Sequence, residues 1–438
     1  MAARTSHSSP RRAAAPIERL AERFAAGFPA QRRGRRRIGR EAEFPLIRPD
    51  GRAGDVALLW EPLLAEPGAR PSYDDPPHRQ LIVRIDFPDA AYEVEMGRAT
   101  AEMVLPPAED LFALEAASWA ALDRLRRAAR TRGMILLGYG IQPRTPAGPG
   151  LMTPKRRYFA LSRAVGWPWM YFTSTAADQV QVDIARPELV EAVNVMNLLS
   201  GPIIALTANS PVYAGRVGRF LSGREGLLAA LGEERHGMTP RRFASVEEFL
   251  TFTCGQTFYV RPEAHRFPRY GRPFTSYLAA RGGRRAEALW QDYLWHEHYI
   301  WNSARPRVHN GTIEVRPACQ QPPDEPMAAV PLCLGLVEAL PQVTAFLEDR
   351  LGRDPWPAMR AYRRAVLREG PRVLEPTPGL LAGLVTLSED ALRARGRHEE
   401  TFLGPIRRRL EARSVPADRA VRLFRQGGIP AIVEALKV

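Results

Sequence analysis

The 438-residue chain is 45% hydrophobic, which is enough for one or two domains with a substantial core, and its net charge of +14 comes almost wholly from arginine. Its three cysteines form no CxxC pair, which argues against a disulfide framework or a zinc knuckle and favours the reducing cytoplasm. The longest apolar run, 198–206, is far shorter than the ~20 residues of a spanning helix, so we expect no membrane association.

The first 40 residues hold eleven arginines and only two acidic side chains, Glu18 and Glu22. Such a basic segment can contact nucleic acid or an anionic membrane, but it contains no recognisable nucleic-acid-binding motif. A transit peptide over residues 1–17 is an alternative, because that stretch is rich in alanine, arginine and serine. We predict instead that residues 1–33 form a disordered, solvated basic leader and that nucleic acid is not a partner.

Three segments after the leader place polar, mostly acidic side chains two residues apart. The pairs are Glu41 and Glu43 in 38–44, Glu93 and Glu95 in 92–96, and Thr100 with Glu102. Side chains two apart point to the same face of a pleated strand. Each segment therefore predicts a strand with one polar face and one apolar face.

Helical periodicity follows between Pro107 and Gly133, where leucines share one face and arginines gather in the C-terminal half. The leucines are Leu111, Leu114, Leu122 and Leu125. We expect this amphipathic helix to lie across a sheet. Residues 187–206 predict a second, largely buried helix that ends before a turn at Asn209-Ser210-Pro211.

Two later segments repeat the alternation of polar and β-branched side chains. They are Gln179-Val180-Gln181-Val182-Asp183 and Thr312-Ile313-Glu314-Val315-Arg316. Beyond about Pro323 helical signals dominate. The chain lacks the regular βαβ spacing of a nucleotide-binding parallel sheet, so we predict an α+β fold with a catalytic core over 34–325 and a helical C-terminal region, 326–438, packed on it.

Five predicted strands thus share a polar face, and its bias towards glutamate, glutamine and aspartate needs an explanation. An antiparallel sheet with one face in water also alternates, but it would mix lysine, serine and threonine with the acids. Clustered carboxylates repel one another unless a cation neutralises them. Magnesium binds a few carboxylates together with substrate phosphates, so the pattern favours a metal-nucleotide site.

These segments resemble the glutamate-cysteine ligase and carboxylate-amine ligase family over residues 38–320, and residues 403–427 show a weaker resemblance. The matching motifs are Gly39-Arg40-Glu41-Ala42-Glu43, Glu95-Met96-Gly97 with Thr100-Ala101-Glu102, Thr175 to Asp183, Ala208-Asn209-Ser210-Pro211, Phe220-Leu221-Ser222-Gly223-Arg224, Arg235-His236-Gly237 and Gly311 to Arg316. Asp292, His296 and Arg305 keep the family's spacing. Cys319 stands where many members have an acidic residue.

The resemblance implies a glutamine-synthetase-like architecture, in which a curved antiparallel sheet backed by helices holds metal, ATP and glutamate on a polar concave face. It implies the following candidate residues. Metal ligands are Glu41, Glu43, Glu95, Glu102 and Glu314; Arg316, Gln181 and Arg305 bind ATP; Arg157, Arg235, Gln179 and Asn209 bind glutamate; and Arg316 and Arg235 are catalytic.

The implied reaction uses ATP and Mg²⁺ to phosphorylate the side-chain carboxylate of glutamate, after which an amine, with cysteine favoured, attacks the acyl phosphate. No general base stands out, and His296 is the one candidate. A different amine or a peptide remains an alternative acceptor because of Cys319. A non-enzymatic alternative is a basic anion-binding protein on a ligase scaffold. The chain is expected to act as a monomer or homodimer in the cytoplasm.

Overall fold

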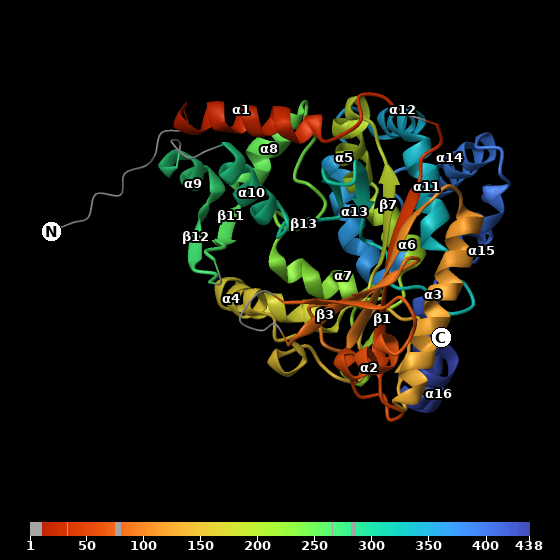
Figure 1. Ribbon diagram of the computed structural model, residues 1–438. Helices are drawn as coiled ribbons and strands as arrows, with labels where there is room; N and C mark the ends of the chain where they lie inside the picture. Colours follow the sequence, from red (N-terminus) through yellow and green to blue (C-terminus); the bar gives the residue numbers. More distant parts are fainter. Residues whose placement is uncertain (1–10, 33, 75–79, 265, 282–285) are drawn as a thin grey trace.

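The computed structural model describes residues 11–32, 34–74, 80–264, 266–281 and 286–438 (Figure 1). Its strands are β1 Ile38–Ile47, β2 Arg70–Tyr73, β3 Ile82–Asp86, β4 Ala91–Val94, β5 Thr100–Ala108, β6 Ile135–Leu136, β7 Asp178–Asp183, β8 Val212–Tyr213, β9 Arg216–Val217, β10 His236–Gly237, β11 Thr257–Val260, β12 Arg269–Pro273, β13 Trp301–Asn302, β14 Ala304–Arg307 and β15 Thr312–Val315. Its α-helices are α1 Arg11–Ala26, α2 Trp60–Leu64, α3 Leu111–Thr131, α4 Arg156–Val165, α5 Leu189–Leu198, α6 Ser200–Thr207, α7 Gly223–Leu228, α8 Val246–Gly255, α9 Phe274–Ala280, α10 Ala286–Glu297, α11 Ala329–Glu338, α12 Leu340–Leu351, α13 Trp356–Glu369, α14 Leu380–Ala394, α15 Gly404–Ala412 and α16 Pro416–Leu436.

A 9-stranded sheet with the order β14-β15-β7-β1-β5-β4-β3-β2 organises the fold, and β6 pairs with the end of β1. Every pairing in it is antiparallel. All five segments predicted as strands therefore belong to one sheet. The register places Glu43 opposite Glu102 and Glu41 opposite Gln179, so the polar alternations fall on a common face.

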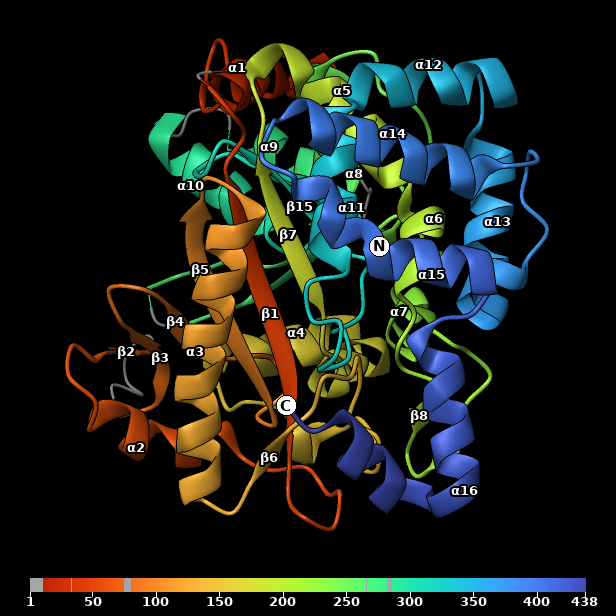
Figure 2. The ribbon, with the colours of Figure 1, turned by 90° about the vertical axis from the view of Figure 1, so that its right-hand side faces the viewer.

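Helices α3, α11 and α14 lie on one side of β1 and β7, as the two ribbon views show (Figures 1 and 2). The predicted amphipathic helix is confirmed as α3, whose four periodic leucines are buried. It begins at Asp110, whose carboxylate accepts a hydrogen bond from the amide of Ala113 at 2.9 Å and so satisfies one unpaired donor of the first turn. Beneath α3, the buried Arg40 guanidinium pairs with Asp178 at 2.7 Å.

The buried helix predicted over 187–206 is present but divided into α5 and α6, whose axes differ by 49°. The break at Leu199 precedes Pro202 in the first turn of α6. Proline has no amide hydrogen to donate within a helix and fits best in the first turn, so Pro202 favours the start of a new helix there. Both halves are buried in the main core.

The other side of the sheet faces a lobe built from α4, α7 and the aromatic helices α8 to α10 (Figure 1). Within this lobe the His296 ring stacks on Phe274, with ring centroids 4.7 Å apart. From Ala329 onward the chain forms α11 to α16, and much of this helical region shares one continuous core with the sheet.

Residues 11–32 correct the expectation of a disordered leader, whereas residues 1–10 and 33 lie outside the described residues. Residues 11–26 form α1, which buries Ile17, Leu20 and Phe24 in the main core. Apolar residues spaced three or four apart give this helix a hydrophobic face that the arginine count conceals. The basic composition of this segment therefore gives no sign of the buried apolar face of α1.

In the part of the chain that the structure describes, no single helix is long and apolar enough to cross a membrane. Two bent pairs, Arg186–Leu198 with Ser200–Thr207 and Ala329–Glu338 with Leu340–Leu351, pass the length and composition test together. The cysteines Cys254, Cys319 and Cys333 are free thiols and all are buried.

Candidate active site

A row of charged side chains crosses four neighbouring strands on the polar face. Arg84 lies opposite Glu93, Glu93 opposite Glu102, and Glu102 opposite Glu43. Directly opposite side chains on antiparallel strands are close neighbours, and like charges in such positions destabilise the pairing. Arg84 pairs with Glu93 at one end of the row, which leaves Glu102 and Glu43 facing each other.

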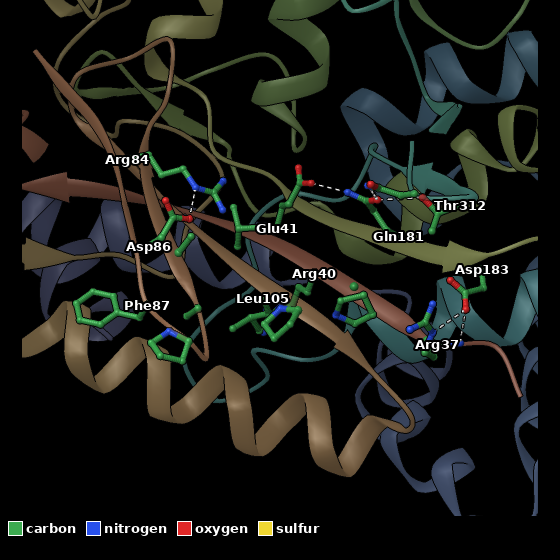
Figure 3. A pocket seen from close by; sticks show the side chains of 18 residues that line it. Arg37, Arg40, Glu41, Arg84, Asp86, Phe87, Leu105, Gln181, Asp183 and Thr312 are labelled. Atoms are coloured by element: carbon green, nitrogen blue, oxygen red, sulfur yellow. Dashed lines mark hydrogen bonds and ion pairs between the residues drawn. The ribbon is translucent and has the colours of Figure 1, made fainter. Parts of the chain in front are cut away.

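Glu41 and Gln181 form the centre of the same face on β1 and β7. The Gln181 side-chain amide donates a hydrogen bond to the Glu41 carboxylate. Its oxygen accepts hydrogen bonds from Asn310 and Thr312, each at 2.9 Å. Figure 3 shows Glu41 and Gln181 pointing toward each other, with Thr312 on the far side of the amide. The chain of hydrogen bonds fixes the orientation of Glu41.

The central carboxylates are held in an environment that disfavours their charge. Burial raises the pKa of Glu41 to about 7, and the neighbouring Glu314 adds to the shift. Burial also raises the pKa of Glu43 to about 7, with a further contribution from Glu95. Burial and then Glu95 raise the pKa of Glu102 well above its usual value. A bound cation would relieve this repulsion, so the donor set suits a divalent metal.

No group of three or more His, Cys, Asp and Glu side chains among the described residues is arranged to hold a metal ion by itself. Magnesium commonly takes only one or two carboxylates and completes its shell with water and phosphate oxygens. The Glu43 and Glu102 pair, with Glu41 and Glu95 nearby, fits that requirement. The metal-ligand role of the five carboxylates expected from the sequence stays a prediction.

Glu314 differs from the other carboxylates because arginines surround it. Arg305 pairs with it, Arg316 lies 2.9 Å away and Arg307 lies 3.9 Å away. Burial acts to raise the pKa of Glu314, but the arginines outweigh it and hold that pKa well below the usual carboxyl range. The Glu314 carboxylate thus pairs with guanidinium groups and helps to orient them.

Arg316 is held between two acceptors on the polar face. Its Nη1 donates hydrogen bonds to the Gln179 side-chain oxygen and to the Glu314 carboxylate. Gln179 in turn donates to Glu43 at 2.8 Å, which links this arginine to the central carboxylates. The predicted residues Gln179, Glu43 and Arg316 are therefore brought together.

Arg224 is a residue to which the sequence analysis gave no role. It is buried, pairs with Glu225 at 2.5 Å, and its positive charge opposes the rise that burial causes in the pKa of Glu43. Its Nε is buried without a hydrogen-bond partner in the structure. Because Arg224 closes the Phe-Leu-Ser-x-Arg match, the signal for it was already present in the sequence.

A cavity of about 380 Å³ opens beside Glu41. Polar groups of Glu41, Gln181 and Arg84 line one part of it, and Phe87, Leu105 and neighbouring prolines line another (Figure 3). The lining also includes Asp86, paired with Arg84, and Asp183, paired with Arg37, so the cavity can accept a ligand that has an apolar part and a polar part.

A second cavity, of about 300 Å³, shares Asn310 with the first as a lining residue. Its walls include Arg157, His298 and Arg307 together with Glu297. The buried Nε of Arg157 has no hydrogen-bond partner in the structure. The cationic lining suits a small carboxylate ligand.

Arg235 and Asn209, two predicted glutamate-binding residues, form hydrogen bonds to backbone groups in the structure. The Arg235 guanidinium donates to the backbone carbonyls of Tyr299 at 3.0 Å and Thr257 at 2.6 Å. The Asn209 amide donates to the carbonyls of Gly138 and Gln320. Both side chains are buried and connect loops of the structure. A short sequence motif reveals the residue type but not its nearest partner in the fold.

His296 and Cys319 also lie within packed structure. The His296 ring bonds the Thr253 carbonyl at 2.8 Å, and burial lowers its pKa to about 3, so the geometry gives it no role as the base. Cys319 is buried against the hydroxyl groups of Ser210 at 3.3 Å and Ser222 at 3.6 Å.

We expect Glu102→Gln to raise the melting temperature of the metal-free protein by a few degrees at pH 8. Because the pKa of Glu102 is raised in the fold, the folded protein keeps a proton that the unfolded chain releases. The free energy of unfolding therefore falls as the pH rises above the pKa of Glu102 in the unfolded chain. The gain should shrink at pH 5, because Glu102 is protonated in the fold. Calorimetry in a chelator, with Glu109→Gln as the exposed control, measures this; equal gains at both pH values would contradict it.

Comparisons with known proteins agree with the geometry. The model of glutamate-cysteine ligase family 2 (GCS2) matches residues 37–435. The chain is 28% identical over 306 residues to a putative glutamate-cysteine ligase 2-3 of Rubrobacter xylanophilus, covering 69% of each protein. It is 31% identical over 200 residues to glutamate-cysteine ligase EgtA of Mycolicibacterium smegmatis, covering 43% of this chain and 46% of the relative.

Two solved structures share the fold. A glutamate-cysteine ligase from Francisella tularensis, in complex with AMP, aligns with a TM-score of 0.52 and 13% identity over 93% of this chain and 88% of that one. A bifunctional glutathione synthetase from Pasteurella multocida aligns with a TM-score of 0.54 and 10% identity over 96% of this chain, which spans only 54% of that enzyme. The predicted glutamine-synthetase-like α+β fold is confirmed. Because its family model covers nearly the whole sequence, the chain belongs to glutamate-cysteine ligase family 2, whose members are ATP-dependent carboxylate-amine ligases.

Proposed function

We propose that the protein uses ATP to activate the side-chain carboxylate of glutamate as an acyl phosphate and joins it to an amine, with cysteine as the favoured amine. A carboxylate is a poor electrophile at neutral pH, so one oxygen has to become a leaving group. The observation that carries the proposal is the single polar face on which Glu41, Glu43 and Glu102 meet Arg316. Phosphoryl transfer needs this combination of charge neutralisation and positioning.

Magnesium would be held by Glu41, Glu43, Glu95 and Glu102. When bound, it would neutralise phosphate oxygens of the nucleotide. Gln181 and Gln179 orient Glu41 and Glu43 through their amide groups. Because the pKa of Glu41 and that of Glu43 are raised to about 7, these two carboxylates become fully available to a cation only above neutral pH.

Arg316 is assigned to the transferred phosphate group. A guanidinium forks to two oxygens and keeps its charge when buried, which suits a phosphate whose negative charge is spread over several oxygens. Glu314 and Gln179 hold it in place, and Arg305 shares Glu314 from the neighbouring strand. Arg224 supplies a second buried positive charge beside Glu43.

The two cavities divide the substrates between them. The cavity beside Glu41 suits the nucleotide, because apolar walls can receive a base while Arg84 and Arg37 border its polar part. The cavity lined by Arg157 and Arg307 suits glutamate, whose carboxylates need cationic partners. Arg235 and Asn209 support these walls through backbone contacts.

The identity of the amine substrate depends on two observations. Relatives that match this chain are named as glutamate-cysteine ligases, which favours cysteine. A different amine or peptide acceptor is the second candidate, favoured by Cys319 in place of an acidic residue. We further propose a cytoplasmic monomer or homodimer, consistent with the free cysteines.

Phosphate release from ATP measured with glutamate and a panel of amines tests the proposed function. Release should require both glutamate and Mg²⁺, should respond chiefly to cysteine, and should fail when glutamine replaces glutamate, because its side-chain amide has no carboxylate oxygen to phosphorylate. Mass spectrometry of the product should show one glutamyl group added to the amine. Strong release with another amine would support the second candidate, and glutamate-independent release would contradict both.

A further inference from the structure

The family match begins at residue 37, yet the structure places an ordered segment before it. We call residues 11–32 the N-terminal strap. Its helix α1 buries Phe24 in an aromatic cluster, with ring centroids 6.2 Å from Phe249 on α8 and 6.1 Å from Tyr293 on α10. Figure 1 shows α1 lying along these helices before the chain turns toward β1.

Beyond α1, the strap packs tightly on the turn between β14 and β15. A Cβ atom added at Gly27 would lie 2.3 Å from Val308 Cγ2 and 3.0 Å from the Val308 carbonyl oxygen. On the other side of the turn, a Cβ at Gly311 would lie 3.3 Å from Pro29. At Gly27 the space is too small for a Cβ atom unless Val308 moves, so the strap backbone packs directly on Val308 of the turn.

The strap is also anchored to the start of α5 and to the sheet. The Pro29 carbonyl accepts a hydrogen bond from the Arg186 amide at 2.8 Å, and the Phe28 carbonyl accepts one from the Arg186 side chain. After the strap, the buried Arg36 forms a two-pronged pair with Glu188. The strap therefore spans from the aromatic lobe to the sheet.

The turn that the strap contacts leads directly to the site. Asn310, at the tip of this turn, donates to Gln181, and Gln181 donates to Glu41. Asn310 also lines both cavities. Displacing the turn would release one partner of Gln181 and change the lining of both cavities.

We propose that the N-terminal strap is a positioning element of the active site, which sets the β14–β15 turn and through Asn310 and Gln181 the orientation of Glu41. This inference rests on the proposed function for its kinetic consequence, but its structural part stands alone. Gly27 is the positioning residue, because it alone lets the strap approach Val308 so closely.

Gly27→Ala tests the inference. The added methyl group must push the turn away, and a shift of about 1 Å near reacting groups can lower turnover by roughly ten- to hundredfold. We expect that loss in kcat/KM at a temperature where the variant is fully folded. Gly255→Ala, in which the new methyl group meets nothing within 4 Å, is the matched control and should keep wild-type activity.

A double variant and a second readout make the result specific. Gly27→Ala combined with Val308→Ala removes the atom at 2.3 Å and should recover most of the activity. Amide hydrogen exchange should become faster in residues 304–315 of Gly27→Ala and return toward wild type in the double variant.

Unchanged exchange in residues 304–315 of Gly27→Ala would overturn the inference, and so would faster exchange with wild-type kcat/KM. If the wild-type protein shows no ligase turnover, the proposed function fails, whereas the exchange comparison still decides whether the strap holds the turn.

Discussion

Glu41→Gln should reduce magnesium-dependent phosphate release by about 1,000-fold or more, while the protein keeps its fold. Glutamine has the same shape and still offers an oxygen to the Gln181 amide, so the hydrogen bond that orients the side chain at this position survives. The lost negative charge removes a ligand from the proposed metal site, because a neutral amide has little attraction for a divalent cation. The magnesium dependence of the rate and the melting temperature measure the two effects separately.

Glu434→Gln is the control for this experiment. Its side chain is 76% exposed and pairs only with Lys437 among the ion pairs of the described residues. It should behave as wild type. Turnover near the wild-type rate in Glu41→Gln would show that Glu41 is not a magnesium ligand. Loss of the folded state would mean that Glu41 stabilises the fold.

Arg316→Ala should lower kcat by roughly 1,000-fold and leave the KM for glutamate nearly unchanged. Its guanidinium is expected to meet charge that develops on the transferred phosphate, so its removal affects the transition state more than substrate binding. Glu314 still has Arg305 as a partner in the variant, so the buried carboxylate does not lose all compensation.

Arg316→Lys separates charge from shape. Lysine keeps the charge but lacks the planar fork, so an intermediate loss is expected. Arg419→Ala, which removes an exposed arginine paired with Asp324, is the control. Steady-state kinetics with varied glutamate gives both parameters, and a rise in KM with unchanged kcat would reassign Arg316 to substrate binding.

The sheet and its polar face were predictable because strand periodicity is strict. A period of two residues fixes which side chains share a face, so Glu41 and Glu43 were placed together before any register was known. The sequence could not show that the Glu314 carboxylate forms ion pairs with arginines. That pairing depends on Arg305 lying opposite it across β14 and β15, which is a matter of register.

The N-terminal strap was missed because charge was summed over the whole segment. The apolar residues Ile17, Leu20 and Phe24 are buried on one face of α1, whereas Arg19 and Arg23 are exposed, and a summed charge does not reveal that difference. A hydrophobic periodicity search over residues 11–28 would have found the helix. For Arg235 the motif match indicated a role but could not reveal the hydrogen bonds to the carbonyls of Tyr299 and Thr257, because those residues are distant in sequence.

The strand order has a consequence for synthesis. In the sheet, β1 near the start of the chain lies beside β7, and β7 lies beside β15, which ends at Val315. Synthesis must therefore run from residue 38 through residue 316 before the acidic side chains of β1 can meet Arg316, which follows β15. Until then, Glu41 and Glu43 lack this cationic neighbour, so the centre of the sheet can fold only after β15 has been made.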